Sequence, residues 1–588
     1  MGTYSLSWDG TRIAHVDTDG TLAVTEPATA TTRQLHQFTA QTVHTMRWSP
    51  DDTHLLLITE DTGQERFTPH ALRLSDTTLR PLAPAGTVQA RGLWTAPDHP
   101  HTLVTAIRRR GDRALHPWRI PLTHDQDFAR PIAHSPDGTR DWAFDTTLTC
   151  RACLTTHPDG SLTLLTAPDG HRWNRLARFS LDDASDTQLL GIDHTTQEVL
   201  LLTAHEAEAV RVLAIHPHTG HRRTSLAAPP YDMTTACLAP DGTPRAALHH
   251  GTRRHYTSTD LTYARDLTRA ATLDPGDLEL LTRDGTDDHW LLAFHHPAHA
   301  PRHYLFDRRT ATGTPLRQRD TPQARHRAPV ETTVLHLTAS DGHPLTAYLT
   351  HPTHTHVPPL VLRIHGGPWT RDHWRHDPEA HQLATDGFAV LRVNYRGSTG
   401  YGRTFRNLGD GEWGARMQQD LYDAIDAVTR QGAAAPGRVA AYGGSYGGYA
   451  ALLALTDPRI HCAIAVNPLV DLTASDWANS PYWRRVQPLW DKQIGWSRLH
   501  RSELRHRSPL HRVTDMHGPT LIARGANDPR IDAKSIDTFI QARQATGGTV
   551  TELILPNDGH TIRSTHGRTS LGQAVSAFLT QHLAPPSD

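Results

Sequence analysis

Short turns rich in proline, aspartate and glycine recur along the first half of the chain, and each precedes a run of apolar residues. Successive turns lie 39 to 56 residues apart. This interval is typical of a β-propeller, in which one blade is a four-stranded sheet of about 40 to 50 residues. Seven such turns predict about seven blades; they stand at residues 9–10, 50–52, 97–98, 136–138, 193–194, 240–242 and 284–285.

Two further turns of the same type complicate the number of blades. Residues 158–160 and 168–170 are both Pro-Asp-Gly and fall between the regular positions. They leave open an eighth blade or one enlarged blade, and we predict seven. A general all-β scaffold is the alternative to a propeller, and it would leave the interpretation of the second half unchanged.

The second half of the chain alternates apolar runs, typical of buried parallel strands, with helical segments. The 588 residues exceed what one hydrophobic core usually serves, and the two patterns meet near residue 325. We therefore predict a β-propeller domain over residues 1–325 and an α/β domain over residues 326–588. A polar linker is predicted over residues 310–328.

One apolar run leads directly into a serine framed by glycines. Residues 438–442 predict a strand and residues 449–455 a helix, and residues 443–448 (Gly-Gly-Ser-Tyr-Gly-Gly) predict the sharp turn between them. Only glycine tolerates such a close approach of strand and helix, and this turn would hold the hydroxyl of Ser445 exposed. A solvent-facing serine in a glycine-rich loop is the alternative, so the test is whether an acid and a base follow.

Both follow, each just past an apolar run that predicts a parallel strand. Asp528 comes after residues 520–524, and His560 comes after residues 551–555. In a catalytic triad the imidazole takes the proton of the serine during attack, and the carboxylate fixes the imidazole tautomer. We predict a triad of Ser445, Asp528 and His560. Asp558 is the alternative acid, but it lies too close in sequence to the histidine to hold it from behind.

Another apolar run, residues 360–364, ends in His-Gly-Gly-Pro at residues 365–368. Backbone N–H groups in such a loop can stabilise the negative charge of a tetrahedral intermediate, at about 3 kcal/mol for each donor. The N–H groups of Tyr446 and Gly367 are the predicted oxyanion donors. An ordinary tight turn is the alternative interpretation of the same residues.

Together these motifs resemble the catalytic domain of the prolyl oligopeptidase family of serine peptidases, closest to its acylaminoacyl-peptidase and dipeptidyl-aminopeptidase-like branch. The similarity covers about residues 330–585 and includes Asn-Tyr-Arg-Gly-Ser-Thr-Gly-Tyr-Gly at residues 394–402. It implies an α/β-hydrolase domain with a mostly parallel eight-stranded sheet, and a propeller that admits peptides and excludes folded proteins. It also implies that Arg530 binds a substrate carbonyl; a surface arginine is the alternative.

Aromatic residues crowd the segment after the predicted strand at residues 463–466, a segment that borders the substrate pocket in the family. Trp477 and Trp483 are the predicted substrate-binding residues, and they would favour an apolar or aromatic substrate side chain. Packing of this segment explains the aromatic residues equally well. No acidic pair that would capture a free amino group is identifiable in the propeller, so aminopeptidase and endopeptidase action both remain open.

Charge and composition exclude several classes of partner. The net charge is −2, and the basic residues form no dense run, so we expect neither nucleic acid nor membrane as a partner. No apolar stretch approaches the ~18 residues that cross a bilayer, and the first residues do not resemble a secretion signal. We therefore expect a cytoplasmic protein. The four cysteines are too few and scattered for a disulfide framework, which fits a reducing compartment.

Metals and cofactors are not expected. The 43 histidines lack the H-E-x-x-H spacing of zinc peptidases. Cys150 and Cys153 form a lone C-x-x-C pair among the propeller strands, and buried thiols explain it more simply than a metal site.

Three functions follow from these predictions. The leading one is a serine peptidase that hydrolyses short peptides through an acyl-enzyme. The second uses the same residues on an ester, amide or thioester of a small metabolite, or transfers the acyl group to an amine. The third is a non-catalytic propeller scaffold, which the complete triad argues against. The expected partner is thus a short peptide or small acyl substrate; the oligomeric state stays open, a homo-oligomer included.

Overall fold

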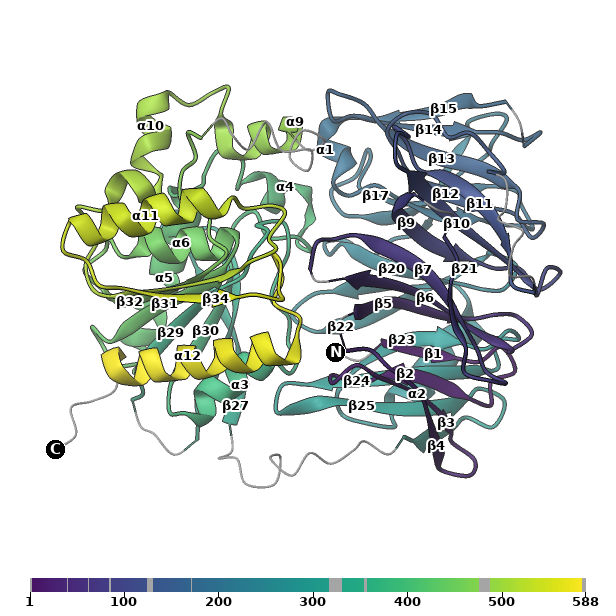
Figure 1. Ribbon diagram of the computed structural model, residues 1–588, viewed down its shortest axis with the longest axis horizontal. Helices are drawn as coiled ribbons and strands as arrows, with labels where there is room; N and C mark the ends of the chain where they lie inside the picture. The colour runs from purple at the N-terminus through teal and green to yellow at the C-terminus, as the bar shows by residue number, and fades with distance from the viewer. Residues whose placement is uncertain are drawn as a thin grey trace. The chain divides into compact units, whose positions relative to one another are not determined.

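The computed structural model describes residues 3–39, 41–61, 63–83, 86–123, 131–170, 172–316, 330–353, 357–474 and 487–583. The chain divides into two compact units, Met1–Phe294 with Arg302–Gln318, and His295–Pro301 with Arg319–Asp588 (Figure 1). The domain boundary predicted near residue 325 lies outside the described residues and stays a prediction. The predicted linker is wrong at its start, because Thr312–Pro315 pairs with the preceding strand of the last blade.

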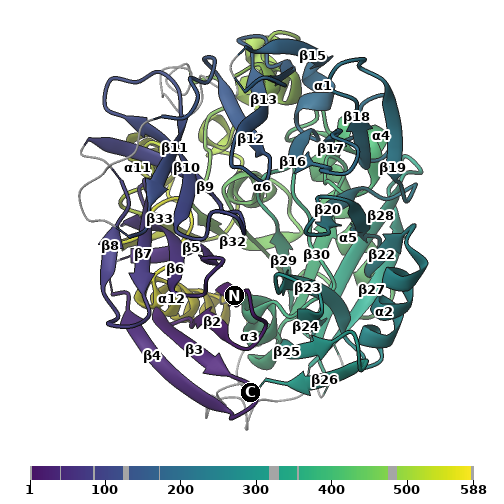
Figure 2. The ribbon, with the colours of Figure 1, turned by 90° about the vertical axis from the view of Figure 1, so that its right-hand side faces the viewer.

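The first unit is a propeller of seven sheets, each built from consecutive strands that follow one another around the ring (Figure 2). This confirms the predicted seven blades. The strands of the first four blades are β1 (Thr3–Leu6), β2 (Ile13–Val16), β3 (Thr21–Glu26) and β4 (Thr31–Gln37); β5 (Gln41–Trp48), β6 (His54–Asp61), β7 (Phe67–Arg73) and β8 (Leu79–Pro81); β9 (Thr87–Trp94), β10 (Thr102–Arg109) and β11 (His116–Pro121); β12 (Thr139–Phe144), β13 (Cys150–Thr156), β14 (Leu162–Thr166) and β15 (Asn174–Phe179).

The last three blades follow the same order along the chain. Their strands are β16 (Gln188–Ile192), β17 (Val199–Thr203), β18 (Arg211–Ile215) and β19 (Arg222–Leu226); β20 (Met233–Leu238), β21 (Pro244–His250) and β22 (Arg254–Ser258); β23 (Asp277–Arg283), β24 (His289–His296), β25 (His299–Asp307) and β26 (Thr312–Pro315). Helix α1 (Leu181–Ala184) follows the fourth blade, and helix α2 (Leu261–Ala271) follows β22.

Aspartates build the recurrent turns through their side chains. In the first turn, Asp9 Oδ1 accepts hydrogen bonds from the hydroxyl of Ser7 (2.6 Å) and the N–H of Thr11 (2.9 Å). All the predicted turns join the first two strands of a blade, except residues 136–138, which precede the first strand of the fourth blade. The two additional turns, 158–160 and 168–170, are hairpin turns within that blade, so they add no eighth blade.

The first and last blades meet without exchanging a strand, since β1–β4 and β23–β26 form separate sheets. The N–H of Leu6 donates to the hydroxyl of Thr282 (2.9 Å), and the N–H of Gly285 donates to the carbonyl of Trp8 (2.8 Å). These hydrogen bonds join the two ends of the ring, a closure that the sequence analysis left open.

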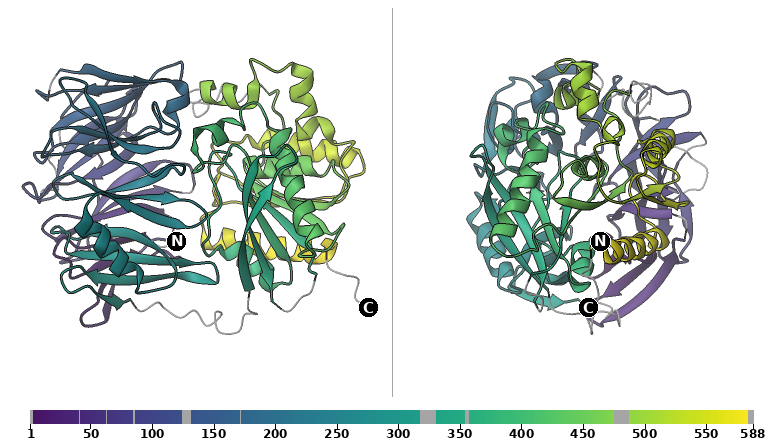
Figure 3. Two further views of the ribbon diagram at one scale, coloured as in Figure 1. Left: turned by 180° about the vertical axis from the view of Figure 1, so that it is seen from behind. Right: turned by 90° about the vertical axis from the view of Figure 1, so that its left-hand side faces the viewer.

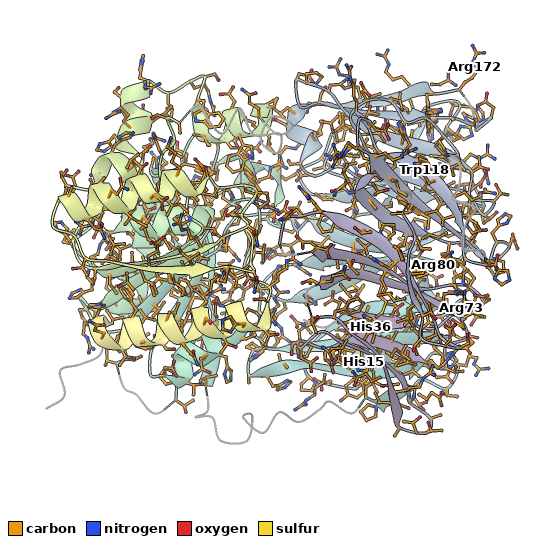
Figure 4. The ribbon with its side chains drawn as sticks, in the orientation of Figure 1. His15, His36, Arg73, Arg80, Trp118 and Arg172 are labelled. Atoms are coloured by element: carbon orange, nitrogen blue, oxygen red, sulfur yellow. The ribbon has the colours of Figure 1, made fainter. Side chains whose placement is uncertain are left out.

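Arginines connect neighbouring blades by donating to backbone carbonyls. Arg80 on β8, labelled in Figure 4, donates to the carbonyls of Pro121 (3.3 Å) and Leu122 (3.2 Å) in the third blade. Arg47 on β5, also in the second blade, donates to the carbonyl of Leu93 (3.2 Å) on β9 in the third blade. A guanidinium carries five N–H donors in one plane, which suits it to several carbonyls along such a seam.

Buried histidines predict a loss of stability below neutral pH. Burial lowers the pKa of His54, His70 and His365 below the ordinary value. Because the folded chain then binds fewer protons at these sites than the unfolded chain, their contribution is complete above about pH 6.5 and is lost as the pH falls below it. We expect the midpoint of thermal unfolding to fall by a few degrees between about pH 7.5 and 5.5.

Calorimetry measures this midpoint. The control is the double variant His54→Gln, His70→Gln, whose amides cannot take up a proton, so its midpoint should vary less with pH. A wild-type midpoint that stays level or rises on acidification would contradict the expectation.

The second unit is built on one eight-stranded sheet in the order β27-β28-β30-β29-β31-β32-β33-β34. Two strand pairs, β27 with β28 and β28 with β30, are antiparallel, and the others are parallel, which confirms the predicted mostly parallel sheet. The strands are β27 (Val330–Thr338), β28 (Pro344–Pro352), β29 (Leu360–Ile364), β30 (Ala389–Asn394), β31 (Val439–Gly444), β32 (Ile460–Val466), β33 (Thr520–Gly525) and β34 (Val550–Leu555).

Helices cover both faces of this sheet (Figure 3). Helices α5, α6 and α11 pack on one face, and α3 and α12 pack on the other. The helices of the unit are α3 (Pro378–Thr385), α4 (Gly402–Asn407), α5 (Arg416–Arg430), α6 (Tyr446–Ala454), α9 (Gln487–Trp490), α10 (Arg501–His506), α11 (Ala533–Ala545) and α12 (Thr565–Leu583), with a π-helical turn at Asp491–Gly495 and a 3-10 turn at Pro509–Arg512. Among the helices described, none has the length and apolar character needed to cross a bilayer.

The parallel strands bring the predicted site residues to one edge of the sheet. Strands β29, β31, β33 and β34 run in the same direction, so their carboxyl ends meet there. The His-Gly-Gly-Pro loop, Ser445, Asp528 and His560 each follow one of these strands in the chain. In open α/β sheets this carboxyl edge is where ligands bind.

Candidate active site

Ser445 lies in the tight turn between β31 and α6. Its backbone dihedrals are φ 56° and ψ −119°, which non-glycine residues rarely adopt. A Cβ atom on Gly443 would lie 2.4 Å from the carbonyl carbon of Gly447, and one on Gly447 would lie 2.1 Å from the carbonyl oxygen of Ile364. The two glycines therefore allow the nucleophile strand, the following helix and β29 to approach closely, as the sequence pattern indicates.

Asp528 and His560 form a buried pair at the same edge. His560 Nδ1 lies 2.7 Å from Asp528 Oδ2, and the two side chains are 7% and 5% exposed. The other carboxylate oxygen, Oδ1, accepts hydrogen bonds from the N–H groups of Arg530 (2.7 Å) and Ile531 (3.1 Å). The backbone thus fixes the carboxylate, which in turn orients the imidazole. An imidazole held through Nδ1 can accept a proton at Nε2.

The alternative acid, Asp558, has a different set of partners. Its Oδ1 accepts from the N–H groups of Arg563 (2.8 Å) and Ser564 (2.8 Å), and its Oδ2 accepts from the hydroxyl of Ser564 (2.6 Å). These contacts hold the turn that leads into α12. The structure therefore pairs His560 with Asp528, and it uses Asp558 to shape the loop.

The predicted oxyanion loop, residues 365–368, lies against Ser445. A Cβ atom on Gly366 would lie 3.6 Å from the Cβ atom of Ser445. Tyr446 is the first residue of α6, so its N–H has no acceptor within the helix. In the described parts of the chain, the N–H of Gly367 makes no hydrogen bond. Both predicted donors are therefore available beside the serine.

Two side chains fix the peptide that carries the N–H of Gly367. The carbonyl of this peptide, on Gly366, accepts a hydrogen bond from the hydroxyl of Thr370 (3.1 Å) and lies 2.9 Å from His365 Nδ1. His365 stacks on Tyr395 with 4.4 Å between the ring centroids, and burial lowers its pKa. A neutral imidazole thus supports the loop from behind.

The hydroxyl of Ser445 forms no hydrogen bond with any residue that the structure describes. Catalytic hydrogen bonds in free enzymes are often long or poorly aligned, and they tighten when substrate binds.

A further side chain, which the sequence analysis missed, lies between the serine turn and the histidine loop. Asn467 directly follows β32 and is 1% exposed. Its only signal in the sequence is a polar residue immediately after an apolar strand.

The substrate-binding predictions lie at the margins of this site. Trp477 and Trp483 fall in residues 475–486, outside the described residues. Arg530 follows Asp528 on the acid loop, and its contact with substrate stays a prediction. Across the described ranges, no three histidine, cysteine, aspartate or glutamate side chains come together as a metal would require.

Two other tryptophans, which follow residues 475–486 in the chain, have distinct environments. Trp490 is 7% exposed and packs edge-to-face on Trp369 (5.2 Å) and Trp413 (5.4 Å), so it belongs to the core. Trp496 donates from Nε1 to the carbonyl of Leu472 (2.8 Å). It lines a pocket of about 280 Å³ together with Leu472, Thr473, Ala474, Gln487, Leu499, Arg501 and Leu504.

The chain is similar to known proteins in sequence and in fold. Residues 374–585 match the prolyl oligopeptidase family. The chain is 28% identical over 567 residues to dipeptidyl aminopeptidase BIII of Pseudoxanthomonas mexicana. This alignment covers 94% of this chain and 82% of that protein. A puromycin-hydrolyzing peptidase of Mycobacterium tuberculosis has a similar fold, with a TM-score of 0.78 at 20% identity over 99% of this chain and 95% of the other. An acylaminoacyl peptidase of Pyrococcus horikoshii also has a similar fold, with a TM-score of 0.72 at 15% identity; the match covers 100% of this chain and 96% of the other.

Proposed function

Because residues 374–585 match the prolyl oligopeptidase family of serine peptidases, we propose that this chain hydrolyses short peptides through an acyl-enzyme formed on Ser445. The observation that carries this proposal is the buried pair of Asp528 and His560, 2.7 Å apart, at the strand ends beside the strained serine turn. A carboxylate anchored by backbone N–H groups, an imidazole and a serine on a tight turn are the parts that acyl transfer needs.

In the proposed reaction, Ser445 Oγ attacks the scissile carbonyl carbon while His560 Nε2 accepts the hydroxyl proton. The N–H groups of Tyr446 and Gly367 stabilise the charge that develops on the carbonyl oxygen. The imidazolium then gives its proton to the leaving amine, and an ester remains on Ser445. Water, activated by the same imidazole, hydrolyses this ester and restores the free serine.

Covalent labelling tests the acyl-enzyme. A fluorophosphonate should phosphonylate the native protein at one site, and mass spectrometry of the digested protein should locate the adduct on the peptide that contains Ser445. The heat-unfolded protein is the control, because an unassembled site does not activate the serine. Absence of an adduct on the native protein, or an adduct on another residue alone, would refute the proposal.

A substrate panel tests the class of substrate. We expect cleavage of short peptides, and the relative named dipeptidyl aminopeptidase makes peptides with a free amino terminus the first to compare with blocked ones. The second candidate is an amide or ester of a small metabolite, which the name of the puromycin-hydrolyzing peptidase favours. Faster turnover of small amides or esters than of every peptide would favour this second function.

We also propose that the propeller restricts access to the site and that the enzyme is cytoplasmic. Restricted access predicts that peptides are cleaved and that a folded protein carrying the same sequence in a surface loop is not. All four cysteines are buried free thiols, which is compatible with a reducing compartment. The expected lack of nucleic-acid, membrane and metal partners stays a prediction.

A further inference from the structure

Strand β32 lies between the strand that leads to the serine and the strand that leads to the acid, yet no predicted catalytic residue follows it. The residue at its carboxyl end is Asn467. It is buried, and its φ of 46° lies in the left-handed region, which asparagine tolerates better than most residues. A strained, buried polar residue at the centre of a catalytic edge points to a role there.

The side-chain amide of Asn467 joins the acid loop to the base loop. Its Oδ1 accepts a hydrogen bond from the N–H of Gly525 (3.0 Å), where the acid loop begins. Its Nδ2 donates to the carbonyls of Gly559 (3.1 Å) and His560 (2.8 Å). The amide therefore holds the backbone of the candidate base itself.

The backbone on either side of this amide continues the connection to the serine. The N–H of Asn467 donates to the carbonyl of Ala523 on β33 (2.9 Å). The carbonyl of the preceding residue, Val466, accepts from the N–H of Ser445 (2.8 Å). The end of β32 is thus bonded to the serine turn on one side and to both other loops of the triad on the other.

The acid and base loops also contact each other directly. The N–H of Ala526 donates to the carbonyl of Leu555 (3.0 Å), and the N–H of Asn527 donates to the carbonyl of Asp558 (3.0 Å). The pairing of Asp528 with His560 therefore has its own support. What the amide of Asn467 adds is the link from the carbonyl of His560 to the strand end that holds the serine turn.

Only a carboxamide fits this position. Its oxygen faces an N–H donor and its nitrogen faces two carbonyl acceptors, so the amide satisfies three buried backbone groups. A carboxylate of the same shape would put an acceptor against two carbonyl oxygens. A side chain without polar atoms would leave all three groups unpaired in the interior.

We infer that Asn467 is a positioning residue, which sets the distance between the imidazole of His560 and the hydroxyl of Ser445. This inference rests on the proposed function, because it assigns a role within that reaction. A misplacement of about 1 Å between reacting groups can lower a rate by about 100-fold. Since Asn467 is not assigned to substrate binding, its loss should act on kcat rather than on KM.

The test uses the full chain with Asn467→Gly and Asn467→Asp. Glycine adopts the left-handed backbone freely, so the first variant removes the amide without adding strain. The second keeps the shape and removes the two donors. Kinetics on the best substrate of the panel, with active sites counted by fluorophosphonate titration, should give a kcat per site that is 10- to 100-fold lower in both variants, with KM within about threefold of wild type.

The matched control is Arg543→Met. Arg543 is 5% exposed and donates to the carbonyl of Gly518 (3.0 Å), ahead of β33 at the opposite edge of the sheet. This variant also loses a buried hydrogen bond and should lower the midpoint of thermal unfolding, but its kcat per titrated site should equal that of wild type.

The outcomes separate this inference from the proposed function. A wild-type protein that fluorophosphonate does not label would refute the proposed function and the inference with it. A labelled wild type combined with an unchanged kcat per site in both Asn467 variants would refute the inference alone. An equal fall of kcat in Arg543→Met would also refute it, because the effect would then reflect a general loosening of the sheet.

Discussion

Replacing Asp528 with asparagine should lower kcat by about four orders of magnitude and leave KM within about threefold of wild type. The reason lies in the hydrogen bonds of the carboxylate. One oxygen accepts from the N–H groups of Arg530 and Ile531, and the other faces His560 Nδ1. In the variant, the two backbone donors retain the amide oxygen, so the NH₂ group turns toward the imidazole.

This orientation forces the wrong tautomer. An NH₂ donor facing Nδ1 requires that nitrogen to be an acceptor, so the ring proton moves to Nε2, the atom that must take the proton of Ser445. Steady-state kinetics with titrated active sites measures the effect. A loss of less than about tenfold would show that Asp528 does not fix the tautomer.

The matched control is Asp558→Asn, on the residue that the sequence offers as the other acid. Its two oxygens accept from Arg563 and Ser564, so this variant should loosen the turn before α12 and lower the midpoint of thermal unfolding. Its kcat should stay within about fivefold of wild type, because the anchored pair of Asp528 and His560 does not use these oxygens. A similar fall of kcat in both variants would mean that the base loop, and not the tautomer, governs the rate.

Local signals made much of this fold predictable from the sequence. The run Leu360–Ile364 is a strand with the predicted bounds, because a short segment that is apolar at four of its five positions is typical of a buried parallel strand. The serine turn was predictable because glycine is required where chain segments come too close for a Cβ atom, and the order of serine, acid and base followed from the positions of strand ends.

The remaining features depend on contacts between distant segments. Asp528 and Asp558 both follow apolar runs, and the sequence favours Asp528 only because Asp558 lies so close to His560 in the chain. The hydrogen bonds show which carboxylate faces the imidazole and which one holds a turn. Asn467 follows its strand like many polar residues, and its role emerges only when three loops converge on its amide. Ring closure at Leu6 and Thr282 joins residues 276 positions apart, so no local pattern reveals it.

Gly447→Ala should produce the second large effect, on both activity and stability. Gly447 lies within α6, where alanine is otherwise favoured, so the backbone conformation is not the obstacle. The new Cβ atom would lie 2.1 Å from the carbonyl oxygen of Ile364, 2.9 Å from its carbonyl carbon and 3.1 Å from the carbonyl oxygen of His365. These are backbone atoms of the strand that carries the oxyanion loop, so no side chain can move aside.

To relieve the overlap, α6 must move away from β29, which separates the N–H of Tyr446 from the N–H of Gly367. We expect kcat to fall by about 100-fold or more and the free energy of unfolding to fall by about 1–3 kcal/mol. The matched variant is Gly444→Ala, at a glycine of the same turn that directly follows Gly443. Its Cβ atom would lie 3.7 Å from the nearest atom, the carbonyl oxygen of Val466. That is an ordinary contact, so this variant should retain kcat within about threefold and unfold at nearly the wild-type temperature. Equal losses in both variants would mean that the turn rejects any side chain, and that the approach of α6 to β29 is not what positions the oxyanion donors.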